Sequence, residues 1–193
     1  MVVPIKEEAK GIFRLGPLDT GHDSGPTSPF LVVGSERALI AEPGQDGQAP
    51  QIVQAVRERG LDLDRVAYVW ASHIHYYHVQ GLSVLLKLLP KAKFLVHPVG
   101  ARHVIDVTRL AEQTGQIWSI ENPKEPGVKK CYGPMAPVPA DRVMTVEDGQ
   151  GIDLGGRELQ IVYAPGHASH HMGLFDRQTR TLFPGDLDTG AGS

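Results

Sequence analysis

Residues 66–78 read Val-Ala-Tyr-Val-Trp-Ala-Ser-His-Ile-His-Tyr-Tyr-His, an apolar run followed by three histidines within six residues. The apolar run is rich in branched and aromatic side chains, which is the composition of a β-strand. A strand that ends in clustered imidazoles is a good frame for a metal site, because the strand fixes the backbone and the loop lets several side chains converge. We therefore expect metal ligands directly after this strand.

The spacing of the three histidines favours one shared target. His73 and His75 lie two residues apart, and in an extended segment this spacing points both side chains the same way. His78 follows three residues later and faces the same pocket if the chain turns into a helix after Tyr76. Imidazole nitrogen is a ligand suited to zinc, iron and related metals.

Two later segments repeat this placement of polar residues at strand ends. His167 follows Pro-Gly after a predicted strand at 158–163, and Asp186 follows Pro-Gly after a predicted strand at 181–183. Three separate strand ends thus each deliver a ligand-type side chain. Such a combination is more specific for a metal site than any one of the three alone.

The overall composition is that of a globular protein. The chain has 193 residues, of which 41% are hydrophobic and 21% charged, and its net charge is −3. This charge argues against nucleic-acid binding through bulk electrostatics. The single cysteine, Cys131, excludes an internal disulfide, so we expect a reducing, cytoplasmic location. We expect no secretory signal and no membrane span, because no window approaches the roughly 18 apolar residues that a span needs.

The pattern along the chain predicts a layered α/β domain. Helices are expected at 50–59, 82–89 and 101–110, and strands at 12–15, 30–33, 38–41, 66–71 and 93–96. A second set of strands, at 142–146, 151–154, 158–163 and 181–183, has short connections and is expected to be antiparallel. Residues 115–140 form a proline-rich excursion. We expect residues 1–193 to form a single domain.

Four motifs together resemble those of the metallo-β-lactamase superfamily. Its His-x-His-x-Asp-His signature corresponds to residues 73–78, with Gly81 following, and its Pro-Gly-His loop corresponds to residues 165–167. A Gly-Asp at a strand end is found at 185–186, and a strand ending in an acidic residue and glycine is found at 40–44. The resemblance covers roughly residues 10–190. It implies a four-layer αββα sandwich, short on its C-terminal side, and a metal-dependent hydrolase.

The resemblance also implies a set of ligands. His73, His75 and His167 would hold a first metal ion, His78 and the residue at 77 would hold a second, and Asp186 would bridge the two. One or two zinc ions are expected, with iron or manganese as alternatives. Asp186 and Tyr77 are the candidate catalytic residues.

The sequence departs from the family pattern in three places, two of which weaken the second metal position. Tyr77 stands where the family has aspartate, and it is interpreted as a plug, a swung-out phenol or a ligand to ferric iron. Glu42, followed by Pro43, stands where the family has aspartate before glycine, which changes the support of the ligands. The sequence also ends seven residues after Asp186, and no candidate for a last histidine ligand is found.

The remaining polar landmarks are given less specific roles. His22 and His103 are expected to be surface or hydrogen-bonded residues, and His97 either borders the pocket or is structural. His170 and His171 are expected to support the ligands or face solvent. No chemistry is assigned to Cys131.

The leading hypothesis for function is hydrolysis of a small ester, thioester or lactone by metal-activated water. The alternatives are a non-catalytic metal-binding relative, and a shortened or engineered chain, because residues 189–193 resemble a linker. The partners expected are a small-molecule substrate and a second copy of the chain, with no nucleic acid and no membrane. Self-association is expected because a sheet without its last strands has an open edge.

Overall fold

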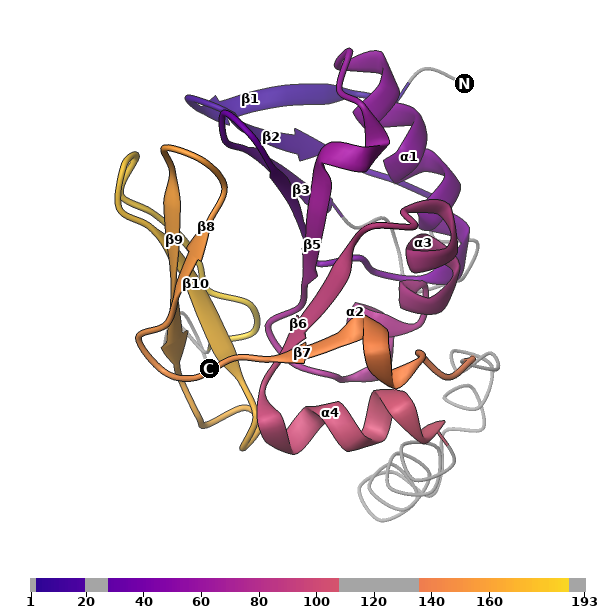
Figure 1. The fold of residues 1–193 in the computed structure, drawn as a ribbon, viewed down its shortest axis with the longest axis vertical. Helices are drawn as coiled ribbons and strands as arrows, with labels where there is room; N and C mark the ends of the chain where they lie inside the picture. The colour runs from indigo at the N-terminus through magenta and orange to yellow at the C-terminus, as the bar shows by residue number, and fades with distance from the viewer. Residues whose placement is uncertain (1–2, 20–27, 108–135, 188–193) are drawn as a thin grey trace, which may run out of the picture.

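The structure is a computed structural model that describes residues 3–19, 28–107 and 136–187 (Figure 1). Two β-sheets lie against each other, and the helices lie on the far side of the larger sheet. His22, Cys131, most of the proline-rich excursion and the residues after 187 are outside the described part of the chain, so the expectations for them stay predictions.

The larger sheet has seven strands in the order in which they occur in the sequence. The first four pair antiparallel and the last three are added in parallel. The strands are β1 (Ile5–Ala9), β2 (Ile12–Leu15), β3 (Phe30–Val33), β4 (Ala38–Ala41), β5 (Val66–Trp70), β6 (Lys93–Val96) and β7 (Val143–Thr145). The predicted hairpin at 30–41 is confirmed as β3 and β4.

Helical connections join the parallel strands, as such crossovers require. The α-helices are α1 (Ala49–Glu58), α2 (Tyr76–Val79), α3 (Leu82–Leu88) and α4 (Pro98–Ile105), and short 3-10 turns lie at Asp46–Gln48, Leu63–Arg65 and Ala140–Arg142. Helix α1 buries Ile52, Val53 and Val56, and Gly60 follows its end with φ of 69°, as the sequence predicted. In the described residues, no helix is long and apolar enough to cross a membrane.

The smaller sheet has four antiparallel strands. They are β8 (Gly151–Asp153), β9 (Glu158–Tyr163), β10 (Met172–Asp176) and β11 (Thr181–Phe183), in the spatial order β11-β10-β9-β8. Among the described residues, no helix covers the outer face of this sheet, where the Leu182 side chain is 48% exposed. The predicted sandwich fold is therefore confirmed, and the described residues contain three of its four layers.

The position of β7 corrects the sequence prediction. The strand at 142–146 was assigned to the antiparallel second set, but β7 pairs in parallel with β6 in the larger sheet. The chain between β6 and β7 contains α4 and is long enough for a crossover, which the short connections of the later strands are not.

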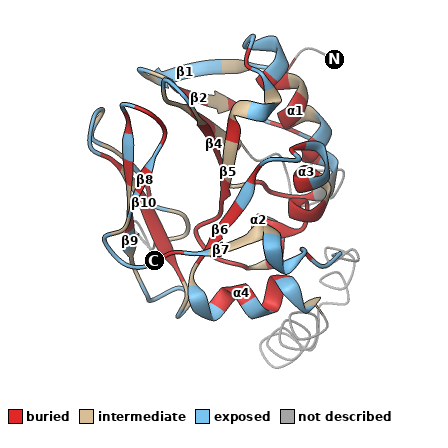
Figure 2. Ribbon diagram, in the orientation of Figure 1, coloured by how far each residue is buried: buried red, intermediate tan, exposed pale blue. Residues whose placement is uncertain are grey.

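Two apolar cores explain why the central strands read as continuous hydrophobic runs. Successive residues of a strand face opposite sides, so Leu39 and Trp70 pack between the two sheets while Ile40 and Val69 pack against the helices. Figure 2 shows buried residues throughout these central strands. The sheets are thus fixed relative to each other, and the loops at their ends are held in place.

A buried arginine joins the two sheets at one end. The Arg157 guanidinium lies 3.0 Å from an Asp176 carboxylate oxygen, and it also donates to the carbonyl oxygens of Lys10, Gly11 and Val33. Arg157 ends the turn between β8 and β9, and its carbonyl partners lie at the β1–β2 turn and the end of β3. Because β3 runs antiparallel to β4, this end of the sandwich is opposite to the one where β4 and β5 end.

Candidate metal centre

Three imidazoles from two distant parts of the chain meet at one point. His73 and His75 follow the end of β5, and His167 follows the end of β9. His75 Nδ1 lies 2.8 Å from His73 Nε2 and 3.0 Å from His167 Nε2. Two nitrogens bound to one tetrahedral zinc ion lie about 3.3 Å apart, given Zn–N distances of about 2.0–2.1 Å. Both distances are therefore close to the spacing expected of nitrogens that bind one cation.

Asp186 lies beside this group and links it to His78. Its Oδ2 atom lies 3.4 Å from His78 Nε2, 3.6 Å from His167 Nε2 and 4.0 Å from His73 Nε2. Ligand atoms within 4.8 Å of one another thus form two groups of three, His73 with His75 and His167, and His73 with His78 and Asp186. All five candidate ligands predicted from the sequence are brought together at one end of the sandwich.

Neighbouring groups orient the rings. The Ser72 hydroxyl lies 3.0 Å from His73 Nδ1, which directs the other ring nitrogen towards the centre. Glu42 accepts a hydrogen bond from the Ser72 backbone N–H at 2.9 Å, and its other oxygen lies 2.6 Å from His78 Nδ1. Glu42 has φ of 58°, which is uncommon for any residue other than glycine. Strain of this kind persists where the surroundings fix the residue, and here two hydrogen bonds do so.

The loop that carries Asp186 is fixed by close packing. Gly185 has φ of 57°, and a Cβ atom there would lie 2.7 Å from His171 Nε2 and closer still to the Ser72 side chain. His171 is buried, and its Nε2 atom accepts a hydrogen bond from the Asp186 backbone N–H at 3.1 Å. Of the two roles expected for His171, support of a ligand is therefore the one that agrees with the structure.

The electrostatic surroundings keep two rings of the three-histidine group, His73 and His75, neutral. Burial and the neighbouring imidazoles lower the pKa of His73, and they lower the pKa of His75 to about 4. Burial also lowers the pKa of His78, but the charge of Glu42 and the hydrogen bonds to Asp186 and Glu42 outweigh it and raise this pKa to about 9. Neutral imidazole is the form that binds metal ions, so the donor set of His73, His75 and His167 fits a zinc-type cation.

Asp186 is held in its charged form. The hydrogen bond from His78 lowers the pKa of the Asp186 carboxyl, and this effect exceeds the opposing effect of burial. The neighbouring His73 and His167 rings act in the same direction as His78. A carboxylate therefore faces the three imidazoles, which is a favourable arrangement for a divalent cation.

The Tyr77 side chain points towards the same centre. Its hydroxyl donates to Asp186 Oδ2 at 3.2 Å, and its ring lies 4.6 Å from the ring of His78. The side chain is 37% exposed. This contact does not agree with a swung-out phenol, one of the alternatives drawn from the sequence.

The other histidines have different surroundings. His97 accepts a hydrogen bond from the Val99 N–H at the start of α4, and its ring packs 4.3 Å from that of Tyr163. His103 is buried in α4 and accepts a hydrogen bond from Arg102. The ring of His170 lies 6.3 Å from that of His73. Sequence reasoning missed Ser72, whose only signal is its position directly before His73.

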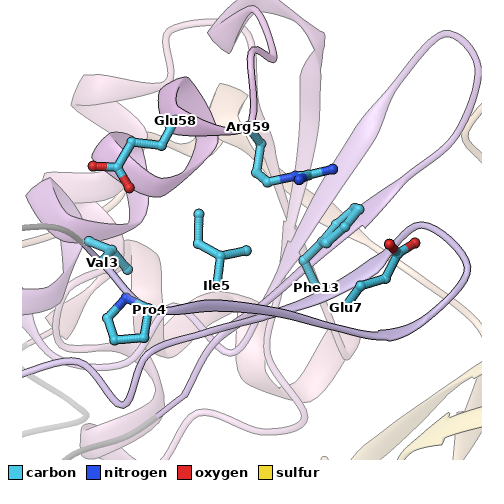
Figure 3. Close-up of a pocket in the computed structure, with 7 residues that line it drawn as sticks. All are labelled: Val3, Pro4, Ile5, Glu7, Phe13, Glu58 and Arg59. Carbon is cyan, nitrogen blue, oxygen red and sulfur yellow. The ribbon is translucent and has the colours of Figure 1, made fainter.

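A hollow elsewhere on the molecule shares no residue with the histidine group. It has a volume of about 450 Å³ and is drawn in Figure 3. The Arg59 guanidinium covers the Phe13 ring at 4.2 Å beside it. The residues that line it are Val3, Pro4, Ile5, Glu7, Phe13, Glu58 and Arg59. No ligand-type cluster is found there among the described residues, so the histidine group remains the candidate site.

The family model described as the metallo-beta-lactamase superfamily matches residues 22–192. This chain belongs to the metallo-beta-lactamase superfamily. The resemblance inferred from the motifs is therefore confirmed. Members of this superfamily bind divalent metal ions, and the described residues include a histidine-rich group suited to one.

Similar proteins agree with this superfamily. The metallo-beta-lactamase fold-containing protein ST1585 of Sulfurisphaera tokodaii is 30% identical over 64% of this chain and 45% of its own length. The solved structure titled as ST1585 from Sulfolobus tokodaii has a TM-score of 0.69 at 24% identity, covering 91% of this chain and 63% of that one. This second comparison shows the fold alone.

Two further relatives have names that state an activity. The acyl-coenzyme A thioesterase MBLAC2 of Gallus gallus is 26% identical over 82% of this chain and 56% of its own length. The hydroxyacylglutathione hydrolase of Aeromonas hydrophila is 23% identical over 84% of this chain and 47% of its own length. The chain thus spans about half the length of the curated relatives that it matches.

Proposed function

We propose that this protein is a metal-dependent hydrolase of small acyl substrates, with thioesters first and esters and lactones next. The observation that carries the proposal is the convergence of His73 Nε2, His75 Nδ1 and His167 Nε2 at the ends of two strands. Three imidazoles with a carboxylate beside them form the donor set of a catalytic rather than a structural site.

In this proposal His73, His75 and His167 hold a zinc ion, with iron or manganese as alternatives. A metal ion bound there supplies Lewis-acid activation of water near neutral pH and polarises the carbonyl group under attack. Asp186, whose oxygen lies 3.4–4.0 Å from the imidazole nitrogens, accepts a hydrogen bond from the attacking water and orients it. The Tyr77 hydroxyl holds the carboxylate in that position.

The preference for thioesters rests on the names of relatives. One is named an acyl-coenzyme A thioesterase and another a hydroxyacylglutathione hydrolase, and both substrates join an acyl group to sulfur. Identities of 26% and 23% do not transfer a substrate, because one fold hosts many activities. The thioester bond is therefore the first substrate class to test.

The test is hydrolysis of acyl-coenzyme A by the zinc-loaded protein, measured as thiol release. We expect turnover that is lost in His75→Ala. The matched control is His97→Asn, which also removes an imidazole but keeps a residue that caps α4 well. The control should keep its activity. Equal rates for His75→Ala and the unchanged protein would refute the proposed site.

A non-catalytic metal-binding relative is the second candidate. The observation that favours it is the Tyr77 hydroxyl on Asp186, since a phenol stands where the family motif has a carboxylate. This candidate predicts bound metal without hydrolysis of thioester, ester, lactone, phosphodiester or lactam reporters. Turnover of any of these that depends on His75 would exclude it.

Self-association and a cytoplasmic location are part of the same proposal. In the described residues, β11 lies at an edge of the four-stranded sheet, and an open edge can pair with a second copy of the chain. Light scattering after size-exclusion chromatography is expected to give the mass of a homo-oligomer. A monomer mass of 21.0 kDa would refute this part.

A further inference from the structure

We infer that the centre takes one metal ion, in the His73, His75 and His167 group, and that the Tyr77 hydroxyl occupies the space beside Asp186 where a second ion would bind. The inference rests on the proposed function, because both concern the same centre. It adds the number of ions and assigns a role to Tyr77.

The first step is that the two groups of ligands share one ring. His73 belongs to both, and one nitrogen of a ring binds one cation. The other nitrogen of His73 is not a second ligand, because the Ser72 hydroxyl lies 3.0 Å from it. The group with His75 is the tighter, with nitrogen–nitrogen distances of 2.8 and 3.0 Å, compared with 3.4–4.0 Å from Asp186 Oδ2 to the nitrogens around it. His73 is therefore assigned to the three-histidine group.

The second step is the count of donors that remain. Without His73, the second group consists of His78 Nε2 and Asp186 Oδ2. Protein sites that hold a catalytic ion use about three ligands of their own. The described residues thus offer a second ion two donors, fewer than the three that such a site uses.

The third step is the direction of the Tyr77 hydroxyl. It donates its hydrogen to Asp186 Oδ2 at 3.2 Å, the same oxygen that faces His78. Because its hydrogen is donated to Asp186, the hydroxyl stays neutral and offers no charged oxygen to an ion between His78 and Asp186. A carboxylate at position 77 would supply a charged oxygen donor and raise the number of donors to three.

The arrangement gives Tyr77 a positioning role. With the phenol on one side and His78 on the other, Asp186 Oδ2 lies 4.0 Å from His73 Nε2. The hydrogen bonds from Tyr77 and His78 thus take over the orientation of the carboxylate. Removing the phenol hydroxyl alone should loosen Asp186 but leave the ion count unchanged.

The test is the metal stoichiometry of the full chain. Metal-free protein is titrated with cobalt(II), followed by its visible absorption, and the zinc-loaded protein is analysed by elemental mass spectrometry. The unchanged protein and Tyr77→Phe are expected to saturate at one equivalent. Tyr77→Asp is expected to take up two equivalents, and Tyr77→Glu repeats the test if Tyr77→Asp does not give a native circular dichroism spectrum.

Each outcome separates this inference from the proposed function. Two equivalents in the unchanged protein would overturn the one-ion inference while leaving a metal-dependent hydrolase possible. One equivalent in both carboxylate variants would overturn the role given to Tyr77. No binding to the unchanged protein would refute the proposed metal site itself, and the inference with it.

Discussion

Replacing Arg157 by methionine is expected to destabilise the folded protein by about 3–5 kcal/mol, the cost of leaving one buried charge without its partner. The Arg157 side chain is 4% exposed and that of Asp176 is 0% exposed, and their N–O distance is 3.0 Å. Without the guanidinium, the Asp176 carboxylate keeps only the Thr179 hydroxyl and the Gln178 N–H. The carbonyl oxygens of Lys10, Gly11 and Val33 would also lose the hydrogen bonds from the guanidinium, and that of Gly11 would keep the Val33 N–H.

Removing the carboxylate of the pair instead of the guanidinium is expected to destabilise the folded protein less. In Asp176→Asn the guanidinium keeps its carbonyl acceptors, so a loss of about 1.5–3 kcal/mol, the value of a hydrogen bond to a charged group, is expected. Burial raises the pKa of Asp176, but Thr179, Gln178 and Arg157 together lower it below its ordinary 3.8. The contribution of Asp176 is therefore complete above pH 3.8 and is lost as the pH falls below that value through the lowered pKa of the folded state.

Urea unfolding followed by circular dichroism measures these changes. The matched control is Arg37→Met, which removes an exposed ion pair with Asp153 and is expected to cost about 0–1 kcal/mol. A loss in Arg157→Met no larger than in this control would refute the reasoning. Because Arg157 lies at the end of the sheets opposite to the histidine group, the folded variant should also keep its metal content.

Three further predictions concern the candidate centre. Gly185→Ala is expected to lower stability by about 1–3 kcal/mol and to reduce turnover, because the added Cβ atom meets Ser72 and His171; unchanged activity and melting temperature would contradict this. Glu42→Gln is expected to reduce activity by about 10–100-fold, because it alters the hydrogen bond that orients His78; full activity in a steady-state assay would count against that role. Zinc at about 100 times its Kd is expected to add about 2.7 kcal/mol to the free energy of unfolding, measured by denaturation with and without a chelator, and equal midpoints would contradict it.

The residues directly after β5 were the most informative part of the sequence for the fold and the candidate site. Clustered histidines after a branched, aromatic run, together with two Pro-Gly loops, indicated both the superfamily and the candidate ligands. The hairpin of β3 and β4 and the amphipathic helix α1 were also predictable, because local periodicity and turn residues determine them.

Elements that depend on distant partners were not predictable. Strand β1 has exposed, charged residues, so its sequence does not have the pattern of a strand. It is stabilised by antiparallel pairing with β2, where Glu8 lies 2.7 Å from Arg14. Helix α4 begins at Pro98, earlier than the predicted 101, because the His97 side chain caps it, and histidine is not a usual cap residue. Strand β10 was missed because Gly173 interrupts its short apolar run.

Within the candidate centre, the sequence named the rings but not their orientation. It did not show that the Ser72 hydroxyl contacts Nδ1 of His73. It also did not show that Glu42 contacts Nδ1 of His78, because these two residues lie 36 positions apart in the sequence. It also left open whether the Tyr77 phenol faces Asp186, because that depends on how the loop after β11 packs. Such contacts come from the tertiary fold, which brings β4, β5 and β11 to one end.

Anomalous diffraction at the zinc edge, on crystals of the zinc-loaded protein, tests the central claim most directly. We expect one peak, about 2.0–2.1 Å from His73 Nε2, His75 Nδ1 and His167 Nε2. A peak coordinated by other residues, or no peak near these three nitrogens, would contradict the account.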